Sequence, residues 1–147
     1  MQHSLILAVI IAALFSSSVF AAGSYDPPPN ADERLKKAIK HIDGERYERA
    51  ISELHKAAKL RPENADIQNY LGFAYRKSSK LEASGKHYAR ALELDPNHKG
   101  ALEYQGELFL MTGAAEKARA NLARLEVLCP EGCSELTDLK AAIAATQ

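Results

Sequence analysis

Two cysteines have the widest range of possible chemistry in this chain. Cys129 and Cys133 are its only cysteines and bracket Pro130-Glu131-Gly132. A thiol pair can form a disulfide, hold a metal ion or exchange electrons. The C-x-x-x-C spacing differs from the C-x-x-C spacing of oxidoreductases and haem attachment sites, and the sequence holds no second ligand pair for zinc. We expect a structural disulfide in an oxidising compartment and keep thiol or metal handling through this pair as the alternative function.

The titratable side chains form no catalytic set. Glu103 and Glu107 lie one helical turn apart, so in principle they could bind a cation or serve as acid and base, but a charged groove wall is favoured. No nucleophile, phosphate-binding loop or further ligand accompanies them. The five histidines have no metal-ligand spacing: His3, His41, His55, His87 and His98. Of these, His55 and His87 are expected on a solvated surface. We expect no enzymatic activity, no cofactor and no metal site.

Composition points to one folded helical domain. The 147 residues are 46% hydrophobic and 26% charged, which is typical of a packed protein rather than a disordered one. Lys plus Arg and Asp plus Glu number 19 each, so the formal net charge is zero. A chain with no net positive charge has no global field that attracts nucleic acid. We expect no nucleic-acid partner.

The N-terminal segment has the pattern of a signal peptide. An apolar run from Leu5 to Phe15 is followed by small residues up to Ala21, although no Lys or Arg precedes the run. An uncleaved membrane anchor is the lesser alternative, because Ser16-Ser17-Ser18 interrupts the run before the about 20 apolar residues that span a bilayer. We expect residues 1–21 to be removed and the protein to be exported, most simply to the periplasm, with no membrane span afterwards.

Three consecutive prolines, Pro27 to Pro29, follow the expected cleavage site. Because proline lacks a backbone N–H and has a fixed φ, this stretch cannot lie inside a helix. We expect residues 22–30 to be a proline-rich spacer.

Apolar residues recur at helical spacing beyond this spacer. Leu35, Ala38 and Ile42 make one stripe, and a second stripe begins at Tyr47 beyond Gly44. The same pair of helices recurs twice, as 65–77 with 81–94 and as 99–112 with 115–128. Three helical hairpins are therefore predicted.

The hairpins repeat with a fixed period. Pro62, Pro96 and Pro130 recur every 34 residues, and Gly72 returns in register as Gly106. Two helices cross closely only where a small residue admits a bulky partner, and a proline ends the second helix of each unit. The period therefore predicts a stack of equivalent units.

The middle unit is the closest to a known repeat. It contains Leu71-Gly72-Phe73-Ala74-Tyr75, Ser84, Tyr88, Ala91 and Asp95-Pro96. These residues resemble the tetratricopeptide repeat (TPR) family. The resemblance implies an all-α helical-hairpin solenoid with three repeats, 31–64, 65–98 and 99–132, and a C-terminal capping helix at 133–147 that Ser134 can cap.

The other units depart from the family pattern in two places. Gln105 stands where the family has Leu. The opening helix of the first repeat fits only if it is shifted by one residue, because its linker from Asp43 to Arg46 is one residue longer after Gly44 than the family norm.

In the family, the opening helix of each hairpin lines a concave groove that binds a polypeptide. Carried over, the partner-binding residues are Asn69, Tyr70, Phe73, Arg76, Lys77, Glu103, Tyr104 and Glu107. Tyr70 and Phe73 are expected to be exposed there unless a neighbouring helix covers them. The clamp with which some members grip a C-terminal carboxylate is absent, since apolar or small residues occupy its positions: Leu35, Ile39, Gly100 and Tyr104.

The resemblance therefore implies a non-catalytic adaptor that binds a protein or peptide segment in its groove. Combined with export, it suggests assistance in assembling a cell-envelope complex. A homo-oligomer is compatible with the same pattern.

Overall fold

The computed structural model describes residues 30–146. This part of the chain contains seven α helices and no strand, which confirms the all-α prediction. The helices are α1 (Ala31–Asp43), α2 (Tyr47–Leu60), α3 (Ala65–Lys77), α4 (Leu81–Leu94), α5 (Lys99–Met111), α6 (Ala115–Leu128) and α7 (Ser134–Ala144). The predicted signal peptide and nearly all of the spacer lie outside the described residues.

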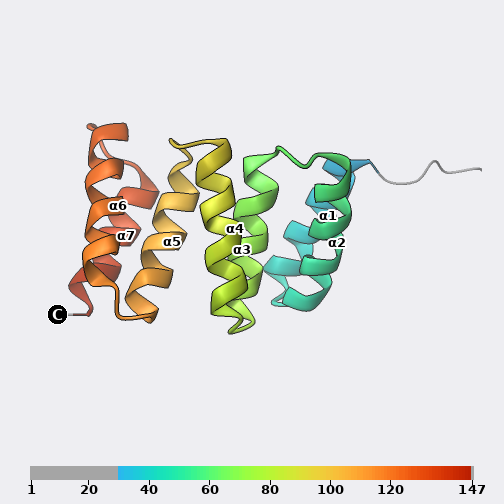
Figure 1. The fold of residues 1–147 in the computed structure, drawn as a ribbon, viewed down its shortest axis with the longest axis horizontal. Coiled ribbons are helices and arrows are strands. Elements are labelled where there is room, and N and C mark those ends of the chain that lie inside the picture. Colours follow the sequence, from blue (N-terminus) through green and yellow to red (C-terminus); the bar gives the residue numbers. More distant parts are fainter. Residues whose placement is uncertain (1–29, 147) are drawn as a thin grey trace, which may run out of the picture.

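The helices stand side by side in one row from α1 and α2 at one end to α6 and α7 at the other (Figure 1). Consecutive helices pack on each other, and α1 also touches α3, α3 touches α5 and α5 touches α7. Within the described chain, the backbones of α2 and α4, and those of α4 and α6, lie farther apart than the backbones of these odd-numbered pairs. The odd-numbered helices therefore lie closer together, and the row curves toward the surface that they form, which we call the inner face.

All three hairpin turns have the same geometry. Glu45, Ser79 and Gly113 each adopt a positive φ, of 55°, 61° and 76°. Each donates its backbone N–H to a carbonyl three residues earlier. The sequence predicted one extra residue in the first turn after Gly44. This prediction is wrong, because the left-handed residue of the turn is Glu45 and not the glycine before it. The first repeat therefore keeps the 34-residue register without a shift, which places Leu35 and Ile39 in register with Asn69 and Phe73.

Helices α1, α3 and α5 begin at side-chain caps that follow the same period. The side chains of Asn30, Asn64 and His98 each accept a hydrogen bond from the backbone N–H three residues later. Such caps satisfy N–H groups that have no partner inside the helix. The expectation that Ser134 caps the last helix is wrong: the N-cap is Cys133, and the Ser134 hydroxyl donates to Glu135.

The close helix crossings occur at the predicted small residues. A Cβ atom on Gly72 would lie 2.5 Å from the ring of Tyr88, and one on Gly106 would lie 2.6 Å from Leu139. The glycine slot of the first repeat holds Ala38, which is fully buried. Leu139 belongs to α7, so the last helix covers the third hairpin as another opening helix would.

A polar contact recurs at one position of every hairpin, between residues 19 apart. Arg34 donates to Glu53, His87 bonds Gln68, and Asn121 donates to the backbone carbonyl of Leu102. The Asn121 amide also donates to Gln105 at 3.1 Å. Gln105, which departs from the family pattern, therefore has a structural partner. The contact is an ion pair in the first hairpin, a hydrogen bond between two side chains in the second and a side-chain to backbone hydrogen bond in the third.

Candidate functional site

Arg76 lies at the centre of the inner face. Its guanidinium carbon lies 5.5 Å from the ring centroid of Phe73 and 5.6 Å from that of Tyr104. Its Nη2 is 2.5 Å from a carboxylate oxygen of Glu107, and its Nε donates to the Tyr88 hydroxyl. The Arg76 side chain is only 11% exposed. Its charge is therefore used within the protein, in a geometry that combines cation–π contact with an ion pair.

The predicted aromatic residues are half-buried rather than freely exposed. The rings of Phe73 and Tyr104 pack 5.0 Å apart, and Tyr70 packs against the core of the first two hairpins. Helix α5 thus covers part of Phe73 through Tyr104, and each of the three residues keeps an accessible edge. Lys77, at the end of α3, is exposed.

Asn69 and Glu103 occupy the same position in successive repeats. They are only 5% and 6% exposed. Within residues 30–146, the Oδ1 atom of Asn69 has no hydrogen-bond partner, and the Glu103 side chain forms no hydrogen bond or ion pair. Gly100 lies one turn before Glu103, and a Cβ atom there would lie 3.2 Å from the Asn69 amide. The absence of a side chain at Gly100 therefore lets Asn69 approach α5.

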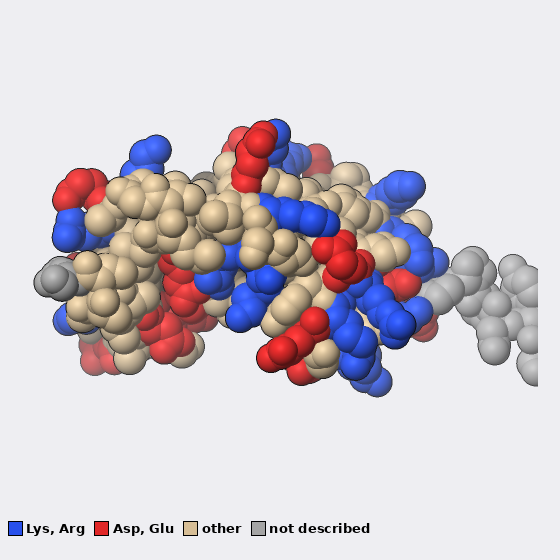
Figure 2. Space-filling view, turned by 90° about the horizontal axis from the view of Figure 1, so that it is seen from below, with Lys and Arg blue, Asp and Glu red and all other residues tan. Residues whose placement is uncertain are grey.

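The surroundings of Glu103 disfavour its charged form. Burial, followed by the neighbouring carboxylates of Glu107, Asp138 and Glu135, raises the pKa of Glu103 to about 8, against a smaller opposing effect of Arg76. Two of these carboxylates belong to α7. Figure 2 shows acidic side chains gathered on the lower left, toward the end formed by α5 to α7, with basic side chains beside them near the middle. The inner face is therefore acidic at its C-terminal end.

The sulfur atoms of Cys129 and Cys133 lie within disulfide distance, and their Cα atoms are 5.8 Å apart. The pair joins the end of α6 to the start of α7. Cys129 is only 5% exposed. The pair therefore holds α7, and with it Glu135 and Asp138, against the third hairpin.

The expectation that both His55 and His87 lie on a solvated surface is wrong for His87. His87 is half-buried, and its ring stacks on Tyr75 at 5.2 Å. Burial, followed by the charge of His55, lowers the pKa of His87. His55 is exposed and bonds the Tyr75 hydroxyl at 2.8 Å. His55, Tyr75 and His87 therefore link α2, α3 and α4. Within the described chain, no three His, Cys, Asp or Glu side chains are placed to hold a metal ion.

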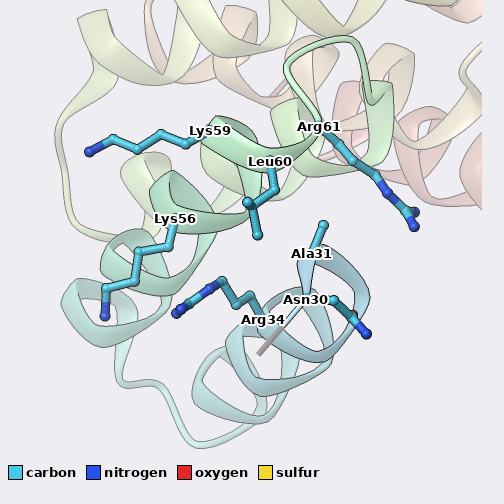
Figure 3. Close-up of a pocket in the computed structure, with 7 residues that line it drawn as sticks. All are labelled: Asn30, Ala31, Arg34, Lys56, Lys59, Leu60 and Arg61. Atoms are coloured by element: carbon cyan, nitrogen blue, oxygen red, sulfur yellow. The ribbon is translucent and has the colours of Figure 1, made fainter. Parts of the chain in front are cut away.

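A basic hollow of about 500 Å³ lies at the opposite end of the molecule, between α1 and α2. In Figure 3, Leu60 and Ala31 point toward each other at its centre, with Arg34 and Lys56 to one side and Arg61 to the other. Three of its cations are already paired: Arg34 and Lys56 with Glu53, and Arg61 with Asp32. None of the groove residues predicted from the sequence lines this hollow.

No helix between residues 30 and 146 has the length and apolar character needed to cross a membrane.

The sequence prediction identified Asn69 and Glu103 as groove residues. It missed their burial and lack of partners, for which a single position in the sequence offers no indication.

The described fold agrees with comparisons to known proteins. A family model described as tetratricopeptide repeat matches residues 35–99 and again 74–132. The comparison with curated proteins found no match.

Among solved structures, one similar fold is the first TPR of Spaghetti (RPAP3) bound to the HSP90 peptide SRMEEVD, with a TM-score of 0.70 and 20% identity over 84% of this chain and 98% of that one. The TPR2B domain of yeast Sti1, in a complex with pHsp70, has a TM-score of 0.72 and 18% identity over 80% and 98%. The type III secretion translocator chaperone SycD of Yersinia enterocolitica has a TM-score of 0.71 and 16% identity over 78% and 88%.

Proposed function

Because this chain belongs to the tetratricopeptide repeat family, whose fold is typically a non-catalytic protein-interaction domain, we propose that it is an adaptor that binds a polypeptide segment on its inner face. The observation that carries this proposal is the surface of α3 and α5, where half-buried aromatic rings lie beside polar atoms without partners. Similar folds support it, since one is described as bound to an HSP90 peptide and another as a complex with pHsp70.

The ligand differs in charge from the HSP90 peptide of the similar structure. That peptide, SRMEEVD, is rich in acidic residues. The inner face of this chain carries Glu103 and Glu107, with Glu135 and Asp138 nearby. Like charges brought together on a partly buried surface repel each other. The proposed ligand is therefore not an acidic tail of that kind.

We also propose that the adaptor acts in the cell envelope and helps to assemble a complex there. The support is the apolar run of residues 5–15 followed by small residues. Fusion of residues 1–30 to a reporter enzyme that is active only outside the cytoplasm tests this location. An inactive reporter would contradict export.

The cysteine pair supports a structural role over thiol handling. A reactive thiol needs an exposed, thiolate-stabilising environment, whereas Cys129 is buried and lies within disulfide distance of Cys133.

Site-specific photocrosslinking tests the adaptor function. A benzoylphenylalanine residue at Lys77, which is exposed at the end of α3, should crosslink to a polypeptide partner in cells. The matched control places the same residue at Lys86, which is exposed on α4 and so lies away from the inner face. Equal crosslinking from both positions, or none from Lys77, would refute binding on the inner face.

A further inference from the structure

Arg76 provides an internal example of a cation on this surface. Its guanidinium lies against both the Phe73 and the Tyr104 ring and pairs with Glu107. Glu103 lies one helical turn before Glu107 on the same helix, and no residue of the described chain pairs with it. Arg76 therefore supplies a partner for only one of two neighbouring carboxylates.

Further carboxylates near Glu103 increase the excess of negative charge around it. The carboxylates of Glu107, Asp138 and Glu135 oppose the charging of Glu103, and the opposing effect of Arg76 is smaller. A buried carboxylate without a partner is costly, because it loses its hydration and gains nothing in return. A ligand that brings a second cation would remove that cost.

A second, independent side chain also lacks a partner. The Asn69 Oδ1 atom is buried and accepts no hydrogen bond within the described chain. A buried acceptor that forms no hydrogen bond destabilises the protein, because it has lost its hydration. Asn69 approaches the same stretch of α5 at Gly100, one turn from Glu103. Asn69 and Glu103, at equivalent positions of successive repeats, therefore both lack a hydrogen-bond donor within the described chain.

Resting on the adaptor function above, we propose that the inner face selects a polypeptide by a Lys or Arg side chain that pairs with Glu103 and Asn69. The aliphatic stem of such a side chain fits against the accessible edges of Tyr70 and Tyr104. A bare metal ion does not fit, since no three acidic or histidine groups of the described chain converge on one point. Beyond this site, Leu35 and Ile39 continue the inner face as an apolar surface that favours an apolar residue next to the basic one.

The test begins with a library of random twelve-residue peptides displayed on phage and panned against residues 22–147. We expect enriched peptides to contain Lys or Arg beside an apolar residue. Each selected peptide is then measured against Glu103→Gln, Asn69→Leu and the control Glu126→Gln, which alters an exposed residue of α6. Loss of one charge pair predicts about 10-fold weaker binding to Glu103→Gln. The control variant should bind like the original protein.

Calorimetry supplies a readout that a purely structural role of Glu103 would not change. Because the pKa of Glu103 is about 8 in the free protein, it is mostly protonated at pH 7. Pairing with a cation should ionise it and release roughly 0.9 proton per peptide bound at pH 7. The apparent binding enthalpy should therefore differ between phosphate and Tris buffers, and this difference should vanish in Glu103→Gln.

The outcomes separate the two proposals. Enriched peptides that lack a basic residue but are blocked by Phe73→Ala would overturn the basic-residue selection and leave the adaptor function standing. No enrichment, or binding that is insensitive to every inner-face variant, would overturn both. Self-association lost in Glu103→Gln and in Arg61→Gln would identify a second copy as the occupant and overturn selection of a separate partner.

Discussion

Two glutamates of this chain are equally buried but have opposite surroundings. Glu53 in the first hairpin and Glu103 in the third are 7% and 6% exposed. Glu53 receives Lys56 at 2.9 Å, Arg34 at 3.2 Å and Lys37 at 3.4 Å. Glu103 instead faces other carboxylates and has no direct partner in the described chain. Burial alone therefore does not decide whether a charge stabilises a fold, since the neighbouring charges decide it.

The same difference separates structural and functional roles. The pairs around Glu53 join α1 to α2 and complete the hairpin. Hydrogen bonding from Lys56, together with Lys37, lowers the pKa of Glu53 against the opposing effect of burial. Burial and like charges raise that of Glu103. A cost that the fold itself does not offset is typical of a binding site.

The two groups predict opposite dependences of stability on pH. The pKa of Glu53 is lower in the folded than in the unfolded protein, so its contribution is present above about pH 4.5 and is lost as the pH falls. The pKa of Glu103 is higher in the folded protein, so its charging costs nothing below about pH 4.5 and reduces stability as the pH rises to about 8.

The largest expected effect is that of Glu53→Gln. The substitution removes the partner of three cations and should lower the free energy of unfolding by about 2 kcal/mol at pH 7. Urea denaturation measures it, with the exposed Glu126→Gln as control. A loss no greater than that of the control would mean that these ion pairs do not stabilise the first hairpin.

Removing the positive charge near Glu103 should have the next largest effect. Arg76→Met keeps an unbranched side-chain stem beside Phe73 and Tyr104 but removes the cation that pairs with Glu107. We expect a loss of about 1.5 kcal/mol at pH 8 and a smaller one at pH 5. Arg90→Met, which breaks only an exposed pair on α4, is the control. Equal losses at the two pH values would show that packing rather than charge determines the effect.

Glu103→Gln should act in the opposite direction to Glu53→Gln. It removes a buried charge without a partner, so we expect a gain of about 1 kcal/mol at pH 8 and almost no change at pH 5. Thermal unfolding at the two pH values measures this gain. A destabilised variant at pH 8 would mean that Glu103 already has a favourable partner and would end the comparison with Glu53.

The smallest effect on the hairpins is expected from replacing Cys129 and Cys133 with Ser. Release of α7 should increase hydrogen exchange in residues 134–146 and leave the three hairpins intact. Because Glu135 and Asp138 would move away, the pKa of Glu103 should fall, which a carboxyl NMR titration can follow. Unchanged exchange and an unchanged pKa would show that the cysteine pair does not hold α7.

Several features of the fold could be predicted from the sequence. Helix ranges such as Ala65–Lys77 and Leu81–Leu94 followed from apolar spacing and were correct. Gly72 and Gly106 were identified as crossing points because a 34-residue period makes small residues recur in register. The turn after Asp43 was misjudged, because a glycine suggests a left-handed residue but Glu45 adopts that conformation when the turn's hydrogen bonds require it.

The sequence by itself determined a stack of helical hairpins, because periodicity and turns depend on residues close together in the chain. The groove positions followed from the resemblance to the TPR family. Only the tertiary structure decided that Arg76 pairs with Glu107, that Glu53 has three cationic partners and that Glu103 has none. These contacts join helices through residues up to 31 positions apart. Burial and electrostatic interactions depend on such distances in space, which the type of a residue does not reveal.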